Sequence, residues 1–274
     1  NDVVRRFRGH PGLLAWYTAD EMPPAFAPIL KERNEATHAL DPDHPTWAVL
    51  ATLHGLREFV PSFDVLGVDP YPVPRAGLEQ VRDLAQGAKR EIFGAKPMWN
   101  VPQMFNWAWY RKEHANSPGV RMPTRAEMAN MAWQSVAAGS NGLIFYSFFD
   151  VMTKEPDGAK REAYWQDMLS VVREVKAHER ELLSDPGPET VCSDAGLVAR
   201  SWSCEADGTF VLVCNTQRKA VSGEVAVGGR KVPVSLGPIE VKTFMLSRPS
   251  FSFPASKRLP AGGGRIKSWR LFDM

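Results

Sequence analysis

Short apolar runs alternate with amphipathic segments over the first two-thirds of the chain. The apolar runs lie at residues 13–21, 46–52, 64–69, 96–105 and 141–149. The segments with apolar side chains at helical spacing lie at residues 25–40, 78–93, 124–138 and 164–183. Buried strands that alternate with helices are typical of parallel β/α units joined by right-handed crossovers. We therefore predict an α/β fold, a parallel β/α domain, over residues 1–186.

The pattern changes after Pro188. Short runs that alternate between apolar and polar residues follow at 197–204, 210–215, 221–227, 231–236 and 241–246. Glycine-containing connections at residues 206–208 and 228–229 are typical of hairpins. We predict a small antiparallel β-sandwich domain over residues 187–247, and an extended tail over residues 248–274, which are rich in proline, glycine and basic side chains.

Charge excludes two classes of partner. The chain has 33 basic and 31 acidic residues, a net charge of +2, and the two signs are interspersed. A surface without a basic patch is not suited to nucleic acid or to anionic lipid. No apolar run approaches the roughly 18 residues of a membrane span. We expect neither nucleic acid nor a membrane as a partner.

The cysteines and histidines predict no special centre. Cys192, Cys204 and Cys214 form an odd set in one region, which favours buried free thiols over a disulfide framework. The six histidines lack metal-ligand spacing, so we expect no metal and no other cofactor. The chain opens at Asn1 without a leader, so we expect its native start to be missing and leave the compartment open, secretion or a periplasmic location included.

Polar residues end four of the predicted strands. They are Asp20 with Glu21, Asp69, Gln103 and Asp150. Because the carboxyl ends of barrel strands converge on one mouth, we expect these side chains to meet there. We take the four acids as candidate catalytic residues, although each could instead cap a turn or pair with an arginine.

Aromatic residues lie on or near the same strand ends. They are Tyr71, Trp99, Trp107 and Tyr146, which together with Gln103 are the candidate substrate-binding residues. In glycoside hydrolysis one carboxyl group protonates the leaving oxygen while a second attacks or activates water. Aromatic rings stack on the apolar faces of sugars. The combination therefore predicts a carbohydrate substrate.

Four motifs carry a family resemblance. LLAWYTADEMPP, DVLGVDPYP, KPMWNVPQMF and NGLIFYSFFD, in this order, resemble the barrel of glycoside hydrolases of the large β-glycosidase clan over residues 1–183. The region behind them is similar to the C-terminal sandwiches of such enzymes. The resemblance implies that Glu21 ends barrel strand four as the acid/base, and that the chain holds strands four to eight, a partial TIM-like barrel. Five strands leave two open edges, so we expect a homo-oligomer.

The same resemblance leaves the mechanism open, because Gln103 stands where the clan has its nucleophilic glutamate. Asp69 or Asp150 could supply the second carboxylate. Alternatively, Asp20-Glu21 resembles the acid pair of β-N-acetylhexosaminidases, in which the acetamido group of the substrate attacks and a tyrosine such as Tyr71 or Tyr146 binds its oxygen.

Our leading hypothesis is hydrolysis of β-O-glycosidic linkages in oligo- or polysaccharides, with Glu21 as general acid. A non-catalytic carbohydrate-binding protein on the same scaffold is the second hypothesis. A structural or assembly role is the third.

Overall fold

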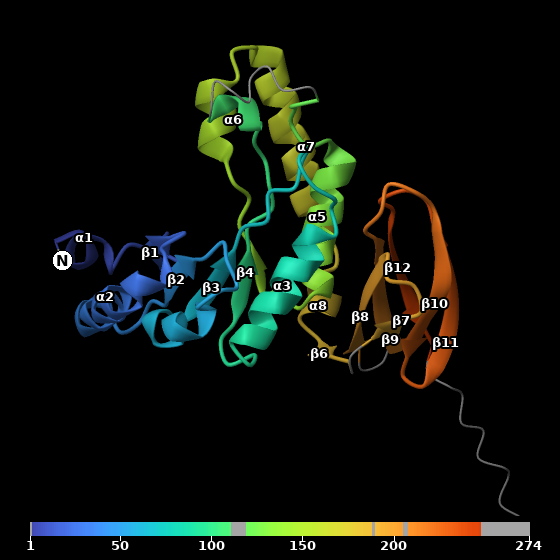
Figure 1. The fold of residues 1–274 in the computed structure, drawn as a ribbon, viewed down its shortest axis with the longest axis horizontal. Helices are drawn as coiled ribbons and strands as arrows, with labels where there is room; N and C mark the ends of the chain where they lie inside the picture. The colour runs from blue at the N-terminus through green and yellow to red at the C-terminus, as the bar shows by residue number, and fades with distance from the viewer. Residues whose placement is uncertain (1, 111–118, 188–189, 205–207, 248–274) are drawn as a thin grey trace, which may run out of the picture.

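The structure is a computed structural model that describes residues 2–110, 119–187, 190–204 and 208–247. Figure 1 shows a parallel α/β region followed by an antiparallel region. The parallel sheet has the order β1-β2-β3-β4-β5. Its strands are β1 (Trp16–Asp20), β2 (Thr46–Val49), β3 (Val65–Val68), β4 (Met98–Asn100) and β5 (Gly142–Leu143). The predicted tail at residues 248–274 lies outside the described residues.

Helices follow the strands as the alternation predicts. The α-helices are α1 (Asp2–Phe7), α2 (Ala27–Leu40), α3 (Gln80–Glu91), α5 (Arg125–Ala137), α6 (Phe148–Lys154), α7 (Gly158–Lys176) and α8 (Glu179–Leu182). Short 3-10 helices are η1 (Pro24–Phe26), η2 (Leu56–Ser62) and η3 (Trp107–Trp109). The Thr124–Glu127 capping box starts α5, with both of its hydrogen bonds formed. None of the described helices is long and apolar enough to cross a membrane.

One predicted strand end is wrong. The run at residues 141–149 forms only β5, then a single bridge between Gln103 and Tyr146, and its last residues begin α6. The Ser147 side chain accepts a hydrogen bond from the Asp150 amide and caps this helix. Asp150 is therefore a helical residue, because a serine three positions before an acid starts a helix more readily than it continues a strand.

The two faces of the parallel sheet differ. One face packs against α2, η2 and α3 in a hydrophobic core that includes Leu30, Phe59, Leu66, Val68 and Met98. Residues on the other face alternate with these. This second face carries an aromatic row, described next.

Tyr17, Trp47 and Trp99 form the aromatic row across the sheet, with ring centroids 4.7 and 6.0 Å apart. Glycines leave space for the two indoles. A Cβ atom on Gly67 would lie 2.7 Å from Trp47 Nε1, and one on Gly142 would lie 2.7 Å from Trp99 Cδ1. The row therefore requires glycine on the neighbouring strands β3 and β5.

The antiparallel region consists of two small sheets, with orders β11-β10-β7 and β12-β9-β8-β6. Its strands are β6 (Asp185–Pro186), β7 (Val191–Cys192), β8 (Leu197–Cys204), β9 (Gly208–Asn215), β10 (Val221–Val227), β11 (Arg230–Leu236) and β12 (Val241–Leu246). Aliphatic side chains of both sheets share one core, as in a sandwich. The antiparallel strands predicted from the alternating pattern are confirmed. The described cysteines are free thiols.

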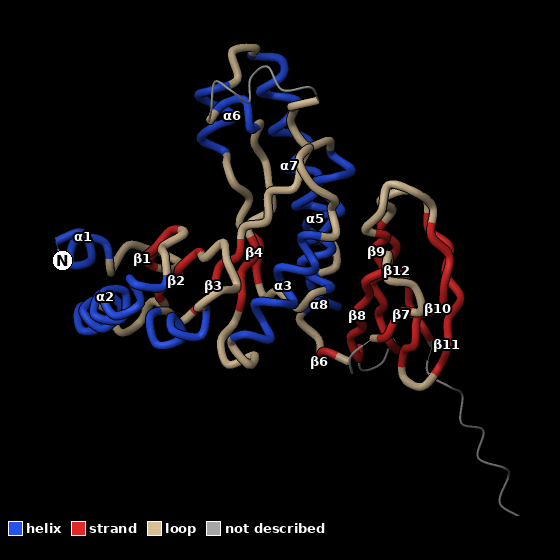
Figure 2. The backbone as a smooth tube through the Cα atoms, in the orientation of Figure 1, coloured by secondary structure: helices blue, strands red, loops and turns tan. Residues whose placement is uncertain are grey.

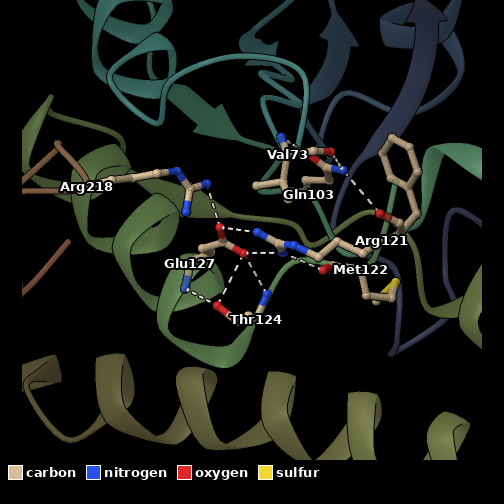
Figure 3. Close-up of polar contacts among 8 residues, drawn as sticks. Val73, Gln103, Arg121, Met122, Thr124, Glu127 and Arg218 are labelled. Carbon is tan, nitrogen blue, oxygen red and sulfur yellow. Dashed lines mark hydrogen bonds and ion pairs between the residues drawn. The ribbon is translucent and has the colours of Figure 1, made fainter. Parts of the chain in front are cut away.

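Helix α5 lies between the two regions (Figure 2). Residues from Glu127 to Ala137 are buried without interruption, so the helix packs on all sides. Glu127 pairs with Arg121 and with Arg218 of the antiparallel region (Figure 3). Asn130 Nδ2 donates hydrogen bonds to the carbonyls of Asn215 and Ile239. These contacts fix the antiparallel region against the parallel one.

Candidate active site

Two acids meet at the carboxyl end of the parallel sheet. Glu21 follows β1 and Asp69 follows β3, so both stand at the same edge of the sheet. Glu21 is exposed, and its backbone has a φ of 48°, a left-handed conformation that turns the chain out of the strand. Asp69 is only 7% exposed. The pair therefore has one member facing solvent and one buried behind it.

The Glu21 and Asp69 carboxyl groups contact each other. Burial, together with the hydrogen bond and the negative charge of Glu21, raises the pKa of Asp69 to about 8. Asp69 Oδ1 is buried with no hydrogen-bond partner among the described residues. A buried carboxyl group beside another acid holds its proton to a higher pH than a carboxyl group in water. The site therefore retains an acidic proton at neutral pH.

Two tyrosines bind these acids. Tyr71 donates a hydrogen bond to Asp69, and Tyr17 donates one to Asp20. Burial, followed by the neighbouring carboxylates, raises the pKa of both phenols above their usual range. Both hydroxyls consequently stay protonated and act as hydrogen-bond donors. Tyr17 is a site residue that was not among the candidates from sequence, although its position on the same strand as Asp20 was visible.

Aromatic rings form a wall beside the carboxyl pair. Tyr71 stacks on Tyr146 at 5.9 Å between centroids, and Phe105 packs its edge on Tyr71 at 4.9 Å. Trp107 lies 6.3 Å from Tyr71, and Tyr110 lies 5.0 Å from Phe105. We call these five residues the aromatic wall. The wall brings together the candidates Tyr71, Trp107 and Tyr146 from three separate loops.

Gln103 lies beneath the wall and is fully buried. Its Oε1 accepts a hydrogen bond from the Val73 amide at 2.9 Å, and its Nε2 donates to the carbonyls of Val73 and Phe105 (Figure 3). The amide thus faces backbone atoms of the loop after Tyr71, where we expected a substrate contact. Trp99, the other candidate from this strand, lies in the aromatic row on the sheet face, beside Trp47.

Asp150 lies in α6 and contacts a lysine and a tyrosine. It is 3% exposed in α6, and Lys154 Nζ lies 2.7 Å from its Oδ1. The hydroxyl of Tyr110 donates a hydrogen bond to Asp150 and lies 3.1 Å from the hydroxyl of Tyr146. Asp150 is thus paired with Lys154 and is linked through Tyr110 and Tyr146 to the aromatic wall. Tyr110 is a second site residue that was not among the candidates from sequence.

The arrangement suits acid catalysis on a ligand with apolar faces. It combines an exposed carboxyl group, a buried partner that holds a proton, neutral phenols and a wall of rings. Among the described residues, no cluster of three or more His, Cys, Asp or Glu could hold a metal ion. Two hollows lie away from these residues: one of about 460 Å³ is lined by α5, α7, α8 and β8, and one of about 1000 Å³ by α3 and the antiparallel region.

No protein-family model and no curated protein matches the sequence. The structure is similar to cyclic α-maltosyl-(1→6)-maltose hydrolase from Arthrobacter globiformis, with a TM-score of 0.52 and 13% identity over 90% of this chain and 58% of that one. It is also similar to a glycoside hydrolase family 5 protein from Bacteroides vulgatus, with a TM-score of 0.52 and 14% identity over 89% of this chain and 61% of that one. The chain spans about three-fifths of the length of both. The resemblance to glycoside hydrolases that the four motifs predicted is thus confirmed at the level of the fold.

Proposed function

We propose that this chain is a glycoside hydrolase whose general acid is Glu21. The contact between the Glu21 and Asp69 carboxyl groups carries the proposal, because it retains a proton at the pH where most glycosides are cleaved. The aromatic wall supplies faces on which sugar rings stack. The two similar structures are named as glycoside hydrolases, which supports the same class of reaction.

The two carboxyl groups have different tasks in this proposal. Glu21 is exposed and therefore reaches the glycosidic oxygen, to which it gives the proton. Asp69 is buried, and its pKa of about 8 keeps a proton beside Glu21 at neutral pH until the substrate binds. Tyr71, a neutral donor on Asp69, steadies the carboxylate that forms when the proton leaves.

Gln103 is an uncharged amide that hydrogen-bonds to backbone groups, so it cannot act as a nucleophile. This favours a mechanism without a protein nucleophile. This observation supports the second candidate, a substrate-assisted β-N-acetylhexosaminidase. There the acetamido group of the substrate attacks, Asp20 orients it, and Tyr71 or Tyr146 binds its oxygen.

We further propose that the five parallel strands correspond to strands four to eight of an eight-stranded barrel. Strands β1 and β5 end the sheet, and no other described strand pairs with their outer edges. Leu14, beside β1, is 68% exposed, which adds apolar surface at one open edge. A homo-oligomer that covers these edges is expected, and a monodisperse monomer in light scattering would count against it.

The test uses a panel of aryl β-glycosides that includes the N-acetylglucosaminide and the N-acetylgalactosaminide. Glu21→Gln should lower kcat on any cleaved glycoside by roughly 10²–10⁴-fold, since it removes the general acid. Asp157→Asn, which keeps a capping side chain at the start of α7, should leave turnover unchanged.

Full activity of Glu21→Gln would refute the assignment of Glu21. Cleavage confined to the N-acetylated glycosides would favour substrate assistance over the other mechanisms. Sugar binding without turnover would leave the carbohydrate-binding hypothesis. Neither binding nor turnover would point to an assembly role.

A further inference from the structure

One cation on the aromatic wall has no carboxylate partner. Arg75 is exposed, and its guanidinium carbon lies 4.3 Å from the centroid of the Trp107 ring. Within the residues that the structure describes, no acid pairs with Arg75. Lys154 lies 3.8 Å from the Tyr110 ring, but Asp150 already neutralises it. Among the described residues with a cation on this wall, Arg75 is therefore the one that can accept an anionic ligand.

The position of Arg75 links it to the carboxyl pair. Its ring partner Trp107 lies 6.3 Å from Tyr71, and Tyr71 bonds to Asp69. The guanidinium and Tyr71 thus both lie beside the Trp107 ring. This spacing suits a sugar unit next to the one that is cleaved.

The loop that carries Arg75 is held in place. The Gln103 side chain binds both the amide and the carbonyl of Val73, and the Ala76 amide donates to the Pro72 carbonyl at 2.6 Å. Stacking on Trp107 also limits the guanidinium to one plane. A group that is ordered before binding loses less entropy when a ligand arrives. Arg75 is therefore presented as a preorganised donor.

Charge indicates which ligand suits this donor. Asp20, Glu21 and Asp69 make the cleavage position itself unfavourable for an anion. A stacked guanidinium keeps its N–H groups available in its own plane, where they match the two oxygens of a carboxylate. We propose that Arg75 and Trp107 form a subsite for a carboxylate-bearing sugar, a uronic acid unit, adjacent to the cleaved unit. This inference rests on the proposed glycoside hydrolase function.

The test compares neutral oligosaccharides with the same oligosaccharides oxidised at C6 to uronates. The panel covers gluco-, galacto- and manno-configured series, and both binding and cleavage are measured. The native chain should prefer the oxidised member of one series. Arg75→Gln should raise KM for that member by roughly tenfold or more, the value of one charge-assisted hydrogen bond, and change its neutral counterpart by less than about twofold.

Arg57→Gln is the matched control. Arg57 also stacks on a ring, Phe93, at 4.9 Å, but it pairs with Glu91 at the far end of α3 from the Arg75 loop. The control should leave both members of each pair unchanged. Cleavage of neutral sugars without a preference for uronates, or an equal loss on both members in Arg75→Gln, would overturn the subsite and leave the hydrolase proposal intact. Failure to bind or cleave any member would overturn both.

Discussion

Replacing Asp69 with asparagine tests directly whether the Asp69 carboxyl group holds a proton near neutral pH. Asparagine has nearly the same shape but cannot ionise. In the native chain the pKa of Asp69 rises from 3.8 to about 8 because the carboxyl group is buried beside Glu21. The folded state consequently holds a proton between these pH values that the unfolded chain has lost.

The sign and size of the effect follow from linkage. A carboxyl group with a raised pKa contributes its full stability below the unfolded pKa and loses it as pH rises toward the folded pKa. A tenfold change in proton affinity corresponds to about 1.4 kcal/mol, so the native chain should lose roughly 5 kcal/mol between pH 4 and pH 8 through Asp69 alone. Asp69→Asn should not lose it. The variant should therefore be more stable than the native chain at pH 8.

Urea unfolding followed by tryptophan fluorescence, at half-unit steps from pH 4 to pH 8.5, measures this difference. Other titrating groups are common to both proteins and cancel when the two curves are subtracted. Ser222→Ala, a change of an exposed side chain that does not titrate, is the control and should give a flat difference. If the difference between Asp69→Asn and the native chain is also flat, Asp69 does not hold a proton at neutral pH and the acid role of the site fails.

Three further changes test other parts of the structure. Glu127→Gln breaks a buried ion pair and should cost about 3 kcal/mol at pH 7 in urea unfolding. Burial alone would raise the pKa of Glu127, but its arginines and backbone donors outweigh burial and lower it to about 2. The cost should therefore fade as pH drops from about 4.5 to 2. A cost that stays constant over this range would contradict the ion pair. Gln103→Ala should cost about 2 kcal/mol and speed hydrogen exchange at the Val73 amide, whereas unchanged exchange would show that the amide has another partner. Gly67→Ala should lower Tm by an overpacking cost of about 1–3 kcal/mol against Trp47, and an unchanged Tm would mean that the indole moves aside freely.

Local pattern sufficed for much of the fold. The runs at residues 197–204, 221–227 and 241–246 form β8, β10 and β12 with the predicted bounds, since alternation is set by one buried face. The strand predicted to reach Phe149 fails for an equally local reason. Ser147 caps a helix there. The serine with an acid three positions later is visible in the sequence, but the prediction followed the apolar run.

The site was predictable only in part. That Glu21 and Asp69 share one edge follows from the parallel strand order. Their contact, and the raised pKa of Asp69, depend on register and on how deeply β3 is buried, which no short pattern encodes. The role of Gln103 was not foreseen because its backbone partner Val73 is 30 residues away.

The burial of α5 from Glu127 to Ala137 has a consequence for cooperativity. Trp133, on α5, shares one core with Trp202 and Phe210 of the antiparallel region. One side of α5 packs against the antiparallel region. Separating the two regions would therefore expose their shared core to water. The two regions should therefore melt in a single transition. If the chain is cut between α8 and β8, neither fragment should fold alone.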